Sequence, residues 1–240
     1  MALNILVTVY ISSEQSNPDL AILNYKQSLL EPTKDFLERF GLKIASILIL
    51  IIATYRLTDI VMGPMANPFY IDMGYSLSEI GYVVKIVALI ATIIGVFIGG
   101  IFVKRLGLYK SLLIGAFLVM FTNLSFSYAS INEKNLVMLA SIVASDSLAA
   151  GIVGTVNITF LTSLVSSKYT GFQYALLTSL MAFLGKLFGG FSGVFVESFQ
   201  NLYGFSYGWM SFYIFTSCLA IPSMLMIYFN KSIFMQTNAN

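Results

Sequence analysis

Six long apolar blocks dominate this chain of 240 residues. They cover residues 43–63, 76–103, 109–129, 136–166, 173–197 and 208–229. Each reaches the roughly 20 residues with which an α-helix, rising about 1.5 Å per residue, crosses about 30 Å of hydrocarbon. Backbone amides and carbonyls find no hydrogen-bond partner in lipid, so such blocks must be helical. The blocks predict an all-α polytopic membrane protein with six transmembrane helices.

The composition excludes several classes of function. Charged residues make up 10% of the chain, against about 25% in soluble proteins. The net charge is +2 and the basic residues are scattered, so no basic face for nucleic acid is expected. The chain has no histidine and one cysteine, Cys218, which removes the usual nucleophile and base pairs and ordinary zinc sites. We expect neither an enzyme nor a bound metal or cofactor.

Basic residues gather in every second connection between the blocks. They are Lys26, Lys34, Arg39 and Lys43, then Lys104, Arg105 and Lys110, then Lys168, and finally Lys231. The positive-inside rule therefore predicts that both termini are cytoplasmic. We expect a cytoplasmic or interfacial lead at 1–42, a six-helix bundle at 43–230 and a cytoplasmic tail at 231–240. Apolar residues recur with helical period in 13–42, which predicts short surface helices, with a plain linker as the alternative.

Five ionisable side chains interrupt the apolar blocks: Arg56, Asp59, Lys85, Asp146 and Lys186. A charge at the hydrocarbon centre costs about 3 kcal/mol even on lenient insertion scales, so several are expected only along a shared polar path. Asp59 is expected to pair with Lys85 or with Arg56, which lies three residues earlier on the same helix face. The five are candidates for a substrate or proton pathway, and their surplus of positive charge favours an anionic solute. Permanent ion pairs that fix helix packing are the alternative.

Glycines and prolines add two expectations about the helices. Small residues let helix backbones approach closely, and they recur on two of the blocks, at Gly95, Gly99 and Gly100 and at Gly185, Gly189, Gly190 and Gly193. Pro64 and Pro68 follow the first block, and proline disrupts a helix interior. We therefore expect the first helix to end before Pro64.

Four segments, in this order and spacing, together resemble the AmpG family of muropeptide permeases, a branch of the major facilitator superfamily. They are YRLTD at 55–59, NPFYIDMGYSLSEIGYVVK at 67–85, GGIFVKRLGLYKSL at 99–112 and TGFQYALLTSL at 170–180. The resemblance covers about residues 43–230 and is to the C-terminal half of the family's transporters. The third segment also resembles the superfamily's cytoplasmic loop motif. Gly100, Arg105 and Gly107 fit that motif, and Lys104 stands where an acidic residue is usual.

The resemblance implies half of a major-facilitator-type transporter in the bacterial inner membrane. Its implied activity is proton-coupled symport of anhydromuropeptides into the cell. Besides lipid and a small anionic solute, the implied partner is an N-terminal six-helix half or a second copy of the chain. A carrier of another bulky anion such as acetyl-CoA is one alternative. The other is a non-transporting remnant or subunit of a split transporter gene.

Overall fold

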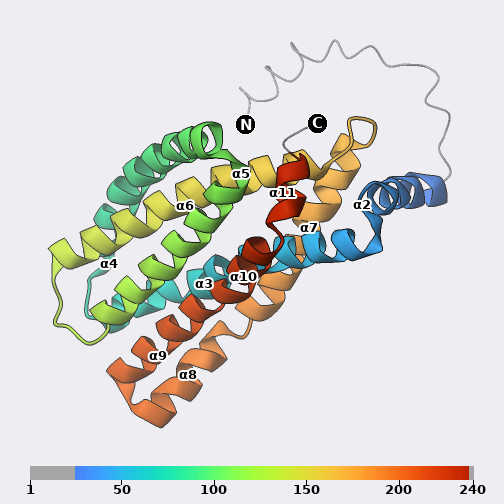
Figure 1. The fold of residues 1–240 in the computed structure, drawn as a ribbon. Helices are drawn as coiled ribbons and strands as arrows, with labels where there is room; N and C mark the ends of the chain where they lie inside the picture. Colours follow the sequence, from blue (N-terminus) through green and yellow to red (C-terminus); the bar gives the residue numbers. More distant parts are fainter. Residues whose placement is uncertain (1–24, 238–240) are drawn as a thin grey trace.

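The computed structural model describes residues 25–237 (Figure 1). Its elements are α2 Tyr25–Tyr55, α3 Leu57–Asp72, α4 Leu77–Tyr82, the π-helical turn η1 Val83–Val87, α5 Ala88–Ala129, α6 Leu136–Leu164, α7 Thr170–Gly189, α8 Ser192–Tyr203, α9 Phe205–Cys218, α10 Ala220–Phe229 and α11 Lys231–Thr237. No strand occurs within this described range. The all-α prediction is confirmed.

Consecutive helices combine into five segments that are long and apolar enough to cross a membrane. They are Leu30–Asp72, Leu77–Ala129, Leu136–Leu164, Thr170–Tyr203 and Phe205–Phe229. The protein is therefore a multi-pass membrane protein. The structure gives five candidate spans where the sequence predicted six, because the predicted blocks 76–103 and 109–129 both fall inside the second segment.

That second segment reverses its direction at Gly107. The residue has φ 80° and ψ 164°, a left-handed backbone conformation that glycine adopts readily and other residues rarely adopt. Figure 1 shows the green ribbon of α5 turning back on itself. Before the turn, α5 and α6 run in the same direction, as shown by the contacts Gly95–Leu148 and Gly99–Ile152. After it they run in opposite directions, as shown by Gly115–Val153 and Thr122–Asp146.

The helix α2 bends at Gly41, where φ is 70° and ψ is 157°. Figure 1 shows the blue ribbon changing direction there. The bend separates an N-terminal arm, residues 25–40, from the rest of α2, so the first of the five segments, Leu30–Asp72, includes part of the arm. A helix is thus present in the part of the lead for which surface helices were predicted, and residues 1–24 lie outside the described part of the chain.

The prediction that the first helix ends before Pro64 is wrong. Helix α3 continues through Pro64 and Pro68 to Asp72. Each proline lacks the amide that would bond to the carbonyl four residues earlier, so Ile60 loses one such partner. A membrane helix tolerates this loss when a neighbouring helix packs against the freed carbonyl. Here Gly189 of α7 packs directly against the Ile60 carbonyl.

The connections between helices meet at two ends of the bundle. At one end the Tyr75 hydroxyl donates to the Asn135 carbonyl at 2.9 Å, which joins the α3–α4 and α5–α6 connections. The Trp209 indole donates to Asp72 at 3.0 Å, which places the start of α9 there too. The other end holds the Gly107 turn, the α6–α7 connection and α11, which share one hydrophobic cluster with the arm.

Candidate functional site

The first candidate group lies where α2 passes into α3. Arg56 leaves helical geometry there, with φ −100° and ψ 3°. Its Nε lies 3.2 Å from Oδ2 of Asp59, and the two side chains are 27% and 21% exposed. The structure thus pairs Asp59 with one of its two predicted partners. A half-buried ion pair is held by mutual attraction, against the cost of partly dehydrating both groups.

Asp146 lies beside this pair, on α6. Its Oδ1 accepts a hydrogen bond from the Thr122 hydroxyl of α5 at 3.3 Å. Asp146 and Asp59 are close enough to interact electrostatically, as are Asp146 and the hydroxyls of Tyr70 and Tyr213. Within the described range, no lysine or arginine forms an ion pair with Asp146. Arg56, Asp59 and Asp146 therefore form a half-buried group with one cation and two carboxylates, called here the charge triad.

Several polar atoms around the charge triad are buried without a hydrogen-bond partner in the part of the chain that the structure describes. They are the hydroxyls of Thr58 and Tyr213, Oδ2 of Asp59 and Nδ2 of Asn123. Asp59 Oδ2 meets Arg56 at ion-pair distance but accepts no hydrogen bond. Buried polar groups nearly always have a protein or water partner. These atoms leave hydrogen-bonding capacity for water or solute beside the carboxylates.

The two candidate lysines lie apart from the charge triad. Lys85 is exposed in the π-helical turn η1, a feature that is frequent at functional sites. Lys186 is exposed on α7, next to Gly185, which packs against Ile60. Neither lysine forms an ion pair or side-chain hydrogen bond anywhere between residues 25 and 237. The structure therefore brings together three of the five predicted site residues and leaves two cations on the surface of the bundle.

The loop-motif residues surround the turn of α5. Gly107 forms the turn itself. Lys104 and Arg105 are exposed just before it, and neither joins a salt bridge within the described chain. A side chain added at Gly100 would meet no atom within 4 Å, so this glycine is not required by packing.

Sequence reasoning missed the residues that surround Asp146. Thr122 and Asn123 are adjacent polar residues inside an apolar block, a signal that was available in the sequence. Tyr70 and Tyr213 come from distant segments, and nothing local indicates their approach to Asp146. Among the described residues, no cluster of three metal-ligand side chains could hold a metal ion.

Several known proteins that are similar in sequence to this chain are named as transporters or permeases. No family model matches the chain. The anhydromuropeptide permease of Escherichia coli K12 is 30% identical over 217 residues, 90% of this chain and 42% of the permease. A Rickettsia prowazekii protein named as an AmpG 1 transporter is 35% identical over 182 residues, 75% of this chain and 39% of that protein. A Rickettsia felis protein named as an AmpG 4 transporter is 29% identical over 214 residues, 89% of this chain and 49% of that protein. The chain spans about half the length of these relatives, or less.

Proposed function

Because this chain is a homologue of the AmpG-type permeases, we propose that it forms part of a secondary active transporter. Its proposed activity is proton-coupled uptake of anhydromuropeptides across the bacterial inner membrane. The observation that carries the proposal is the charge triad, half-buried among membrane-length helices. Ionisable groups at this depth are costly and mark proton or solute pathways in transporters.

The proposed topology has six crossings, with both termini in the cytoplasm. The reversal at Gly107 divides Leu77–Ala129 into two antiparallel crossings, which adds one to the five candidate spans. The arm, the Gly107 turn, the α6–α7 connection and α11 meet at the end that carries most of the basic residues. By the positive-inside rule this end faces the cytoplasm. In this proposal 1–42 is the lead, 43–230 the bundle and 231–240 the tail.

The charge triad supplies a reason for proton coupling. Arg56 contributes +1, and Asp59 and Asp146 contribute −1 each, so the triad has a net charge of −1 when all three are ionised. An uncompensated charge in a medium of low dielectric is unfavourable. One proton neutralises the group, and the bundle then moves without carrying a net charge across the hydrocarbon. Lys85 and Lys186, exposed and without an ion-pair partner in the described chain, are proposed contacts for the anionic solute.

We expect Asp146→Asn and Asp59→Asn to remove the pH dependence of uptake while membrane insertion stays intact. Each substitution leaves one cation and one carboxylate, a group that is neutral without a proton. Under an inward proton gradient, uptake by the variants should be several-fold slower than uptake by wild type. Collapse of the gradient should leave the rate of each variant unchanged. Initial rates at a series of external pH values check this. Wild-type pH profiles for both variants would reject the assignment of the proton to the triad.

The solute is tested by uptake into spheroplasts. Labelled anhydromuropeptide is offered to cells that express this chain alone, and then together with a candidate N-terminal six-helix half. Competition by unlabelled coenzyme A esters distinguishes a carrier of acetyl-CoA from a muropeptide permease. Uptake that exceeds the background and is displaced by unlabelled muropeptide supports the proposal. Background uptake in every combination would favour a non-transporting subunit or remnant.

A further inference from the structure

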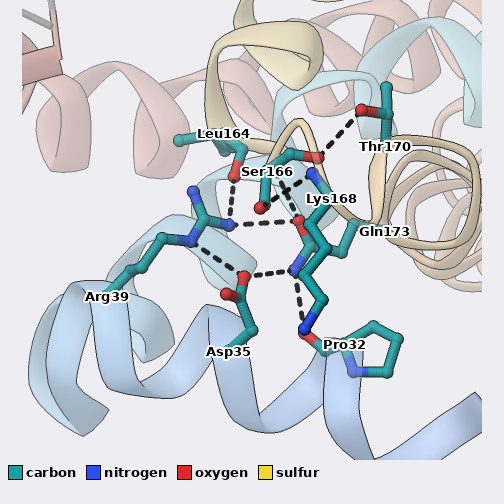
Figure 2. A network of polar contacts seen from close by, with 8 residues as sticks. All are labelled: Pro32, Asp35, Arg39, Leu164, Ser166, Lys168, Thr170 and Gln173. Atoms are coloured by element: carbon teal, nitrogen blue, oxygen red, sulfur yellow. Dashed lines mark hydrogen bonds and ion pairs between the residues drawn. The ribbon is translucent and has the colours of Figure 1, made fainter.

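The side chain of Gln173 is the centre of a polar network at the end of the bundle that holds the Gly107 turn (Figure 2). Its amide nitrogen donates to the Pro32 carbonyl at 2.8 Å and to Asp35 Oδ2 at 2.9 Å. Its amide oxygen accepts from Arg39 at 3.1 Å and from the Ser166 backbone at 2.7 Å. Gln173 is only 2% exposed. A glutamine amide has two donor hydrogens and two acceptor positions, and all four are used here.

The network joins segments that are distant in sequence. Pro32, Asp35 and Arg39 belong to the arm of α2, whereas Ser166 and Gln173 belong to the α6–α7 connection and the start of α7. Arg39 adds two bonds of its own, to Asp35 Oδ2 at 3.0 Å and to the Leu164 carbonyl at 3.0 Å. Figure 2 shows the guanidinium of Arg39 and the amide of Gln173 facing each other between the two segments.

Apolar packing beneath the network is incomplete. A cavity of about 80 Å³ lies between the arm and α7, lined among others by Pro32, Phe36 and Leu177. The opposite side of the arm carries Lys34 and Glu38, an ion pair whose side chains are 76% and 67% exposed. The arm thus has one charged face toward solvent and an apolar face toward the bundle, with a small cavity beside it. Phe36 also anchors the arm in the hydrophobic cluster at this end of the bundle, and the hydrogen bonds to Gln173 and Arg39 fix the arm against the α6–α7 connection.

We propose that Gln173 is a clamp that makes the arm a rigid part of the transmembrane bundle. Gly41 would otherwise leave the arm joined to its span through a single left-handed residue. With the clamp closed, the arm follows the α6–α7 connection whenever the bundle moves. This inference goes beyond the proposed transport function, and its test requires no transport measurement.

Amide hydrogen exchange of the full chain in detergent tests the clamp. Gln173→Glu keeps the size of the side chain and both acceptor positions, but it loses both donors and places a second carboxylate beside Asp35. We expect exchange of the arm, residues 25–40, to accelerate by about tenfold or more, with exchange in α6 unchanged. Gln200→Glu is the matched control, because the Gln200 amide nitrogen has no partner in the described chain. The control should leave exchange of the arm as in wild type.

A second measurement, of the distance between two spin labels, tests the clamp in case the Gln173→Glu variant folds poorly. Spin labels at Lys34 and Lys168, both exposed, report the arm against the α6–α7 connection once Cys218 is replaced by serine. A single narrow distance distribution that broadens in Gln173→Glu and in Gln173→Leu supports the clamp. Distributions that are equally narrow in wild type and both variants would overturn it. A wild-type distribution as broad as that of the variants would overturn it too.

Discussion

Gly95→Ala is expected to cause a large loss of stability, because it places a methyl group where the α6 backbone lies. A Cβ at Gly95 would overlap the Leu148 carbonyl oxygen and lie 3.0 Å from the carbonyl carbon. Backbone atoms cannot rotate away as a side chain can, so α5 and α6 would have to separate. A Cβ at Gly151 of α6 would overlap the Thr92 carbonyl oxygen of α5 in the same way. Overpacking of this kind costs about 1–3 kcal/mol or more.

Gly100→Ala is the control for Gly95→Ala. Gly100 lies on the same helix, and a Cβ there meets no atom within 4 Å. Gly100→Ala should therefore be neutral or slightly stabilising, since alanine favours a helix over glycine. The measurement is thermal unfolding in detergent, followed by size-exclusion profiles of the heated samples. Equal unfolding midpoints for Gly95→Ala and Gly100→Ala would contradict the close contact between α5 and α6.

Arg56→Met is expected to destabilise the protein by an amount between the roughly 1 kcal/mol of an exposed ion pair and the roughly 3–5 kcal/mol of breaking a fully buried one, because this pair is half-buried. Arg56 is the only cation that forms an ion pair within the charge triad in the described chain. Its loss leaves the carboxyl groups of Asp59 and Asp146 without a compensating positive charge. The same substitution should raise the number of protons bound on folding, since two carboxylates must then be neutralised. Unfolding midpoints measured in detergent across a pH series check both effects.

The double variant Arg56→Met with Asp59→Asn separates charge from shape. It removes the same cation but also removes the carboxylate that lost its partner. Most of the lost stability should return, because replacing both members of a buried pair costs much less than replacing one. If the double variant is as unstable as Arg56→Met alone, the ion pair does not explain the effect.

Local patterns in the sequence predicted the features that depend on one helix. The apolar blocks gave the helices, because lipid leaves the backbone no other hydrogen-bonded form. The spacing of Arg56 and Asp59 gave their ion pair, since residues three apart share a helix face. The glycine spacing indicated close approach, and the structure shows it at Gly95, Gly99 and Gly185.

Features that depend on tertiary contacts could not be predicted in this way. The continuation of α3 past Pro64 depends on packing against another helix at Gly189. The neighbours of Asp146 come from three other helices, and helix periodicity contains no information about which helices meet. No local pattern indicates the role of Gln173 in the segment TGFQYALLTSL, because three of its four hydrogen-bond partners lie on the arm, far away in the sequence.

Proton movement driven by the solute is the most direct test of the proposed mechanism. The chain is reconstituted into proteoliposomes, either alone or with an N-terminal six-helix half, whichever combination takes up solute in spheroplasts. The proteoliposomes contain a pH-sensitive dye and start without a pH gradient. Addition of anhydromuropeptide outside should acidify the interior in wild type and leave the pH unchanged in Asp146→Asn. Uptake of labelled solute without any acidification in wild type, or acidification of the same size in Asp146→Asn, would contradict proton coupling through the charge triad.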